Sequence, residues 1–161
     1  MKAFIFVFLI SSSVFASNFE YSAFTGIWLL DSGISPINCV LNYRGPMQLI
    51  GDAENHNVRG YFKDGYRIEI ANINEGAIKF NSCWSDGIMG YSEVVGEGTR
   101  LTDTIVYQDG GFFCLGGSEV RRSVDQFELK DNLFVMNLVS RMGTTNFLLG
   151  QSEVCTFKRI Q

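Results

Sequence analysis

The feature that most constrains the fold is a series of short segments in which apolar and polar residues alternate. A period of two is the pattern of a strand that buries one face. Ile68 and Ile70 lie on one face of such a segment, and Arg67 and Glu69 lie on the other. The segments expected to be strands are Thr25–Asp31, Ile37–Tyr43, Arg67–Ile73, Ala77–Cys83, Leu101–Tyr107, Val124–Leu129, Leu133–Val139, Asn146–Leu149 and Val154–Ile160.

Glycines recur between these segments, and the chain holds 17 of them. An interior glycine costs a helix about 1 kcal/mol, so we expect no helix of about twelve residues or more. The pattern is typical of a two-sheet sandwich or a closed barrel. Closure is favoured because a meander hides its unpaired edges that way. We predict an all-β, antiparallel meander that closes into a barrel of about eight to ten strands. Gly51–Gly65 and Ser85–Gly98 are expected to be irregular.

The first 16 residues have the pattern of a signal peptide. Lys2 precedes the apolar run Ala3–Ile10, and Val14-Phe15-Ala16 fits a cleavage site. The apolar run is shorter than the roughly 20 residues of a spanning helix, so a membrane anchor or a buried helix is the weaker alternative. We predict a single domain over residues 17–161 that is exported, either periplasmic or secreted, with no transmembrane segment in the mature chain.

Cysteine usage agrees with export. Cys39, Cys83, Cys114 and Cys155 form no CxxC pair, so a zinc knuckle or a thioredoxin-type motif has no support. Four cysteines in an exported domain predict two disulfides with three possible connectivities. We expect Cys83–Cys114 and Cys39–Cys155, with four free buried thiols as the alternative.

Charge and residue content exclude several kinds of function. The net charge of −4 and pI near 5.0 argue against a nucleic-acid partner. His56 is the one histidine, so sites built on two histidines are excluded. It could act as a general base beside Asp52 or Glu54, but no nucleophile motif accompanies it, and we interpret it as an exposed loop histidine. We therefore expect no enzyme activity, no metal and no cofactor. An outer-membrane barrel is disfavoured because the segments are short and carry charges on both faces.

Phe24-Thr25-Gly26-Ile27-Trp28 is the most specific motif of the chain. Its Gly-x-Trp resembles the first strand of the lipocalin-like, or calycin, barrels. The resemblance implies that Gly26 lets the strand bend, that Trp28 closes one end of the barrel, and that a late cation, Arg159 or Lys158, packs on the tryptophan ring. A core tryptophan in another β fold is the alternative.

The same residues also resemble small periplasmic inhibitors of secreted metalloproteases. Those barrels begin with Gly-x-Trp-x-Leu and have a cysteine some ten residues later, as in Gly26–Leu30 and Cys39-Val40-Leu41. The resemblance implies that the N-terminal tail, here Ser17–Tyr21, would enter a protease cleft. The four widely spaced cysteines depart from the single bridge of that family.

Aromatic residues supply the remaining signal, since 18 of them follow residue 16. Most must fill the core, and a surplus could line an apolar cavity or form a protein-binding patch. The candidate binding residues are expected in exposed loops and are Tyr61, Phe62, Tyr66, Phe112 and Phe113. Our first hypothesis is non-catalytic binding of a small apolar or amphipathic ligand inside the barrel. The alternative is an inhibitor or interaction module that docks on a hydrolase through its N-terminal tail or aromatic loops.

Overall fold

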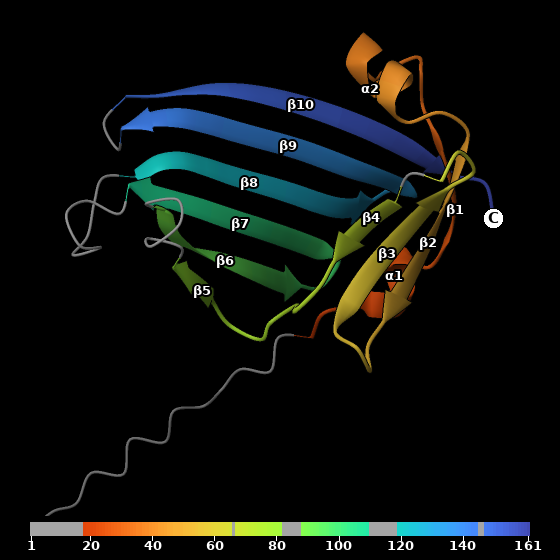
Figure 1. Cartoon of the computed structure of the whole chain (residues 1–161). Helices are drawn as coiled ribbons and strands as arrows, with labels where there is room; N and C mark the ends of the chain where they lie inside the picture. Colours follow the sequence, from red (N-terminus) through yellow and green to blue (C-terminus); the bar gives the residue numbers. More distant parts are fainter. Residues whose placement is uncertain (1–17, 66, 82–87, 110–118, 145–146) are drawn as a thin grey trace, which may run out of the picture.

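The computed structural model describes residues 18–65, 67–81, 88–109, 119–144 and 147–161. Strands dominate this part of the chain, and two short helices accompany them (Figure 1). No helix within the described ranges is long and apolar enough to cross a bilayer. The elements in chain order are α1 (Tyr21–Phe24), β1 (Gly26–Leu30), α2 (Ile37–Asn42), β2 (Pro46–Asp52), β3 (Asn57–Phe62), β4 (Arg67–Ile70), β5 (Ile78–Asn81), β6 (Ile88–Glu97), β7 (Arg100–Asp109), β8 (Glu119–Lys130), β9 (Leu133–Thr144) and β10 (Phe147–Arg159).

All ten strands belong to one antiparallel sheet in the order β4-β3-β2-β1-β10-β9-β8-β7-β6-β5. The sheet curves so that β2–β4 face β5–β9 across a concave side (Figure 1). The all-β prediction is therefore confirmed. Between the described residues of β4 and β5 the sheet is not closed, so the closed barrel stays a prediction.

Residues 71–76 join the two edges of the sheet at one end. The Ile73 N–H donates to the carbonyl of His56, 3.0 Å away, beside the start of β3. The Asn74 N–H donates to the carbonyl of Val94 in β6 at 2.9 Å. The Asn74 side chain accepts from the Gly96 N–H and donates to the Gly96 carbonyl, at 2.8 and 3.0 Å. This crossing segment brings the two edges together without a continuous ladder.

The hydrophobic core fills the concave side at the same end. Phe134 is its centre, with ring centroids 5.9 Å from Trp28, 5.8 Å from Phe157 and 6.2 Å from Phe127. Each fully buried aromatic or aliphatic side chain stabilises the fold by about 1.5–3 kcal/mol. These strands therefore bury their inward positions at this end, while their outward positions carry polar residues and some exposed aliphatic ones, such as Leu29 and Val154.

Helix α1 covers this end of the core. Phe24 is fully buried, and its carbonyl accepts a hydrogen bond from Nε1 of Trp28 at 3.1 Å. Phe19 is also buried, and the neighbouring Glu20 N–H donates to the carbonyl of Gly98 at 2.8 Å. A Cβ on Gly51 would lie 1.8 Å from the carbonyl oxygen of Tyr21, so only glycine allows the helix to sit this close to β2.

The expected strand over Ile37–Tyr43 is wrong, because this segment forms α2. Cys39 and Tyr43 are buried and four residues apart, which is a helical spacing, and the Tyr43 N–H donates to the Cys39 carbonyl at 2.8 Å. Pro36 precedes the first helical residue and fixes the entry of the chain into the helix.

The expected loop over Gly51–Gly65 is also wrong, since most of it belongs to the β2–β3 hairpin. Asp52 forms the turn by accepting the N–H groups of Glu54 and Asn55, both at 3.1 Å. Val58 and Phe62 face the core, while charged and polar residues between them hid the alternation. Part of the second irregular stretch is β6, and the two last expected strands are one continuous strand, β10.

Candidate functional site

The concave face changes from apolar to polar along strands β6–β10. One row of neighbouring positions across the sheet continues the core: Gly96, Leu101, Phe127, Met136 and Cys155. The next row, two residues away on each strand, is Val94, Asp103, Asp125, Leu138 and Glu153. Three of these five residues are carboxylates. Because register partners point to the same side of a sheet, these carboxylates lie on the core side of the sheet and not on its outer face.

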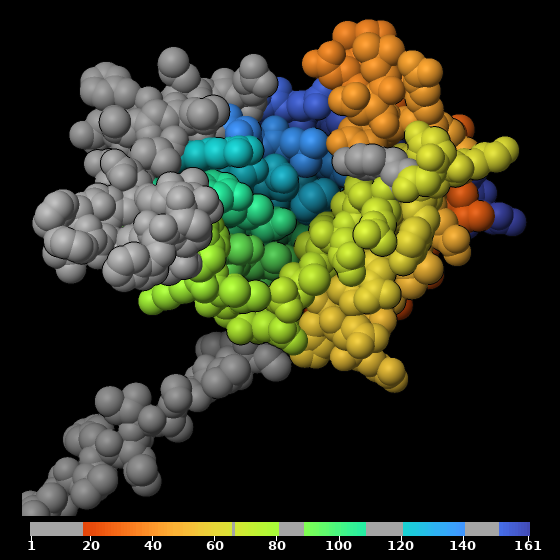
Figure 2. Space-filling model, viewed as in Figure 1, coloured from red at the N-terminus to blue at the C-terminus, as the bar shows by residue number. Residues whose placement is uncertain are grey.

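A hollow of about 520 Å³ lies over this polar part of the face. Its volume is within the roughly 300–1,000 Å³ of small-molecule sites. Figure 2 shows the molecule recessed between β3–β4 in yellow and the green-to-blue strands, with α2 in orange at the rim. The lining includes Asn38 of α2 and five side chains of β8–β10, namely Ser123, Asp125, Leu138, Ser140 and Glu153.

Leu138 marks the boundary between core and hollow. It is partly buried and packs against the core cluster, while Asp125 and Glu153 occupy the positions beside it on β8 and β10. The hollow therefore offers hydrogen-bond acceptors and hydroxyls over its floor, with an apolar side chain at the deep edge. Such a lining suits a ligand with one polar and one apolar part.

Asp103 and Asp125 are direct register partners on β7 and β8. Burial, and then the charge of Asp125, raise the pKa of Asp103 above its ordinary value. Burial also raises the pKa of Asp125, and hydrogen bonds from the Val139 N–H at 3.3 Å and the Ser123 hydroxyl at 3.5 Å partly offset this. Oδ1 of Asp103 is buried without a hydrogen-bond partner in the described part of the chain.

Few other charged residues accompany Asp103 and Asp125 on the polar part of the concave face in the described structure. Glu153 also buries one oxygen, Oε1, without a partner among the described residues. Arg121, on the concave side of β8 two residues before Ser123, lies with its guanidinium 5.5 Å from the ring centroid of Tyr107. The cation at this end therefore rests on an aromatic face rather than on the aspartate pair.

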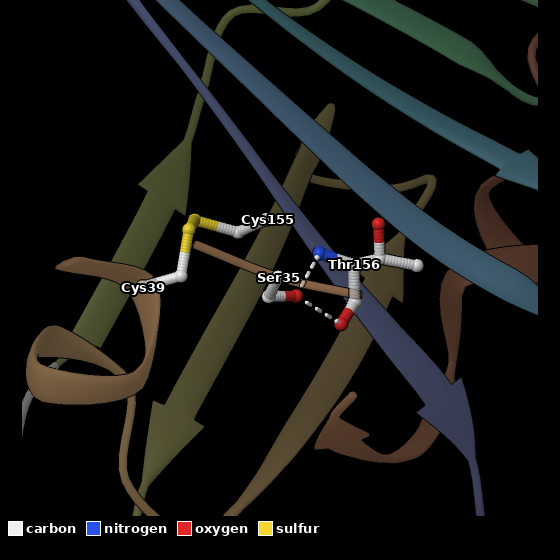
Figure 3. Close-up of a disulfide and its surroundings, with 4 residues drawn as sticks. All are labelled: Ser35, Cys39, Cys155 and Thr156. Carbon is white, nitrogen blue, oxygen red and sulfur yellow. Dashed lines mark hydrogen bonds between the residues drawn. A yellow bond between two sulfur atoms is a disulfide. The ribbon is translucent and has the colours of Figure 1, made fainter. Parts of the chain in front are cut away.

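A disulfide holds α2 at the rim of the hollow. Cys39 of α2 is bonded to Cys155 of β10, as expected from the sequence, and both are fully buried (Figure 3). Ser35 reinforces the attachment, since its Oγ accepts the Thr156 N–H at 3.0 Å and donates to the Thr156 carbonyl at 3.2 Å (Figure 3). The disulfide and the two hydrogen bonds of Ser35 thus fix α2 against β10 and place Asn38 in the lining of the hollow.

Potential metal ligands converge at one place in the described part of the chain, where Glu153 approaches Cys39 and Cys155. The two sulfur atoms bond to one another and are not thiolates, so they supply no ligand of the kind that holds a metal. Cys83 and Cys114, and therefore the second expected disulfide, lie outside the described residues.

The residues of the Gly-x-Trp motif meet at the end of β1. The guanidinium of Arg159 lies 5.2 Å from the centroid of the Trp28 ring, and the two residues are register partners. Arg159 also donates to the carbonyl of Thr25. A Cβ on Gly26 would lie 2.8 Å from Nε of Arg159, so glycine leaves room for this arginine. Lys158, the other candidate, instead forms an ion pair with Asp31 at 2.7 Å.

The two aromatic binding candidates that the structure describes, Tyr61 and Phe62, lie on opposite faces of β3. Tyr61 is 42% exposed on β3, but Phe62 is only 5% exposed and stacks on Tyr43 at 5.6 Å, so its assignment to an exposed loop is wrong. It faces the core because inward and outward positions alternate along β3. Tyr66, Phe112 and Phe113 lie outside the described residues. His56 is exposed, and its Nδ1 lies 3.1 Å from Oε1 of Glu75.

The N-terminal tail is part of the fold from residue 18 onward. The Gly98 N–H donates to the carbonyl of Asn18 at 3.1 Å, and Phe19 packs against Phe24 with centroids 5.3 Å apart. An inhibitor that inserts this tail into a protease would have to remove Phe19 from the core. Ser17 lies outside the described residues.

The row that contains Asp103, Asp125 and Glu153 was not predicted from the sequence, and two of these carboxylates, Asp125 and Glu153, line the hollow. The signal was present, since Leu101, Asp103 and Ile105 alternate with Thr102 and Thr104 and therefore share one face of a strand. The register of the five strands β6–β10 decides which face is concave and which rows of residues lie beyond the core. This register cannot be predicted from the alternation within a single strand. Comparison of the chain with models of protein families, with curated proteins and with solved structures finds no match.

Proposed function

We propose that this chain is an exported, non-catalytic binding protein with a lipocalin-like fold, and that it holds a small amphipathic ligand in the hollow of its curved sheet. The observation that carries the proposal is the hollow of about 520 Å³ over the row of Asp125, Leu138 and Glu153. The sheet would act as an incomplete barrel, with α1 and the crossing segment 71–76 at the filled end.

The lining favours an amphipathic over a purely apolar ligand. The aromatic side chains that could have lined an apolar cavity, such as Phe134 and Phe157, are fully buried against one another. The floor of the hollow offers carboxylate oxygens instead, so a ligand whose polar end donates hydrogen bonds would match it. Its apolar end would contact Leu138.

Export is supported by two features of different kinds. The first 16 residues have the pattern of a signal peptide, and Cys39–Cys155 is the type of bridge that persists in oxidising compartments. The absence of a nucleophile motif in the sequence agrees with binding rather than catalysis.

Equilibrium titration with the fluorescent amine N-phenyl-1-naphthylamine tests the proposal. The mature protein should bind it saturably, and competition should be strongest for dodecylamine, weaker for dodecanol and weakest for dodecanoate, because carboxylates form the floor. Asp125→Asn should reduce the preference for the amine over the alcohol. The opposite order, with dodecanoate strongest, would contradict the proposed lining.

A matched pair of substitutions places the binding in the hollow. Ser140→Phe would fill the space, whereas Gln48→Phe adds the same side chain to an exposed position of β2. We expect at least a ten-fold loss of affinity for the first and unchanged affinity for the second, with thermal unfolding confirming that both are folded. Equal affinities in the two variants would refute the site.

A further inference from the structure

Strand β10 has an edge that is unpaired over most of its length, here named the free edge. Strand β9 pairs with nearly the whole of β10, whereas β1, its neighbour on the other side, pairs only with residues 157–159. Along residues 147–154 no other described strand lies on the side of β10 that faces away from β9. Figure 1 shows β10 as the uppermost strand of the sheet, with α2 at one end of it. A strand edge of this kind presents a row of unpaired backbone N–H and C=O groups.

The hydrogen bonds of Thr156 show which backbone groups face the free edge. The Asp31 N–H donates to the Thr156 carbonyl at 2.8 Å, and Oγ of Ser35 accepts the Thr156 N–H at 3.0 Å (Figure 3). The backbone of Thr156 therefore points away from β9. Because this direction alternates along a strand, the N–H and C=O groups of Val154, of Ser152 and of every second residue before them point the same way. Ser35 and Asp31 thus satisfy one position of the edge, and no described segment satisfies the positions before it.

The two terminal strands of the sheet are protected against pairing with another chain, but the free edge of β10 is not. Strands β4 and β5 have four residues each, and they carry the charged residues Arg67, Glu69 and Lys79. Short length and charge are common protections of edge strands. The free edge is longer, and residues 147–154 contain no proline, lysine or arginine and only one charged residue, Glu153. This contrast indicates that the free edge is available to a partner.

The concave side of the free edge is acidic. Glu153 and Asp125 both line the hollow, and no lysine or arginine is among the described residues of that lining. Oε1 of Glu153 is buried and has no hydrogen-bond partner in the described part of the chain. On the outer side of β10, Ser152 and Val154 are exposed. A strand added at this edge would therefore meet a carboxylate on one face and an aliphatic side chain on the other.

We propose that the free edge of β10 binds an extended segment of a partner protein by strand addition, with basic side chains on the concave side and aliphatic side chains on the outer side. Backbone hydrogen bonds to β10 would provide affinity, and the alternating side chains would provide specificity. A lysine or arginine opposite Glu153 would supply the donor that its buried oxygen lacks. A second copy of this chain fits less well, because residues 147–154 offer no cation and both copies carry a net charge of −4.

Fluorescence anisotropy with a labelled peptide tests strand addition. The probe is a peptide of about seven residues that alternates valine and lysine and has blocked ends. In the proposed register valines lie opposite Ser152 and Val154, and a lysine lies opposite Glu153. The valine N–H groups then donate to β10, whereas the lysine N–H groups point away from it. N-methylation of two valines should weaken binding at least about ten-fold, and N-methylation of two lysines should leave it nearly unchanged.

Substitutions in β10 test the same edge from the side of the protein. Ser152→Pro removes one donor from the free edge, and proline is tolerated in a strand where its nitrogen faces an unpaired edge. This variant should bind the peptide at least about ten-fold more weakly, whereas the matched control Ser152→Val, which keeps the N–H, should bind it as the parent does. Thermal unfolding confirms that both variants are folded. Glu153→Gln should reduce the preference for the valine–lysine peptide over a valine–glutamate peptide by about five-fold.

Three results would overturn the inference. Equal binding of the two N-methylated peptides would show that charge alone attracts them, and loss on N-methylation of the lysines would contradict the assigned face of β10. Absence of peptide binding, with self-association of the parent that Ser152→Pro abolishes, would make a second copy the partner. The inference does not rest on the proposed function, although the two sites adjoin at Glu153. The N-methylated peptides are compared on the unaltered protein, so their outcome is separate from that of the titration with N-phenyl-1-naphthylamine.

Discussion

The Cys39–Cys155 disulfide should contribute more to stability than any other single link to α2. The two cysteines are 116 residues apart in the sequence, so the bridge closes most of the chain into one loop. In the chain-entropy description of cross-links, a loop of this length lowers the entropy of the unfolded chain enough to stabilise the fold by about 4.8 kcal/mol at 25 °C. We expect Cys39→Ala/Cys155→Ala to lower the free energy of unfolding by about that amount.

Urea unfolding followed by tryptophan fluorescence measures this loss. With a slope of about 2 kcal/mol per molar urea, the midpoint should fall by about 2 M. Ser35→Ala is the matched control, because it removes two hydrogen bonds to the same strand and leaves the bridge intact. It should cost about 1–2 kcal/mol. If the double cysteine variant loses less than about 1 kcal/mol, the bridge does not constrain the unfolded chain as reasoned, and α2 is an appendage that opens locally.

Three further perturbations test other parts of the structure. Gly51→Ala should destabilise the protein by about 3 kcal/mol or more, because the new Cβ would lie 1.8 Å from the Tyr21 carbonyl oxygen. Thermal unfolding measures the loss. An unchanged unfolding midpoint would show that α1 does not pack on β2 at this point. Arg159→Ala should lower the free energy of unfolding by about 1–3 kcal/mol, because it removes the cation from the indole face of Trp28 and a hydrogen bond to the Thr25 carbonyl. It should also alter the fluorescence of Trp28. An unaltered spectrum would argue against the contact between the guanidinium and the indole ring. Asp103→Asn should raise the free energy of unfolding at neutral pH and leave it unchanged well below pH 3.8. Burial and the charge of Asp125 raise the pKa of Asp103 in the folded protein above the value of 3.8 that it has in the unfolded chain. As the pH rises above 3.8 the unfolded chain therefore loses this proton first, and the ionised carboxyl destabilises the folded state. Urea unfolding at the two pH values decides it, and a loss of stability at neutral pH would refute the sign.

Much of the sheet could be predicted from local pattern. The hairpin of β8 and β9 turns at Asp131 and Asn132, which both adopt positive φ, and these residue types signal such a turn in the sequence. The pairing of Cys39 with Cys155 was expected from the predicted export and because they are the first and the last cysteine of the chain. Arg159 was expected over Trp28 from the resemblance to lipocalin-like barrels.

The errors have physical causes. Cys39 and Tyr43 carry the helical period of α2, but apolar Ile37 and Leu41 on the exposed face gave the segment the mixed pattern of a half-buried strand. The carboxylates beyond the core could not be recognised because alternation assigns Asp103 and Asp125 to a face without showing where the core on that face ends. That limit is set by α1 and the crossing segment 71–76, which pack against the sheet from distant parts of the chain.

Native mass spectrometry of the mature protein, expressed with its first 16 residues in a cell that exports it and purified without detergent, tests the central proposal most directly. We expect a retained amphipathic molecule in the parent protein and in Gln48→Phe, and none in Ser140→Phe. A parent protein that carries no small molecule and takes up none from an added mixture of dodecylamine and dodecanol, or a Ser140→Phe variant that retains the same molecule as the parent, would contradict it.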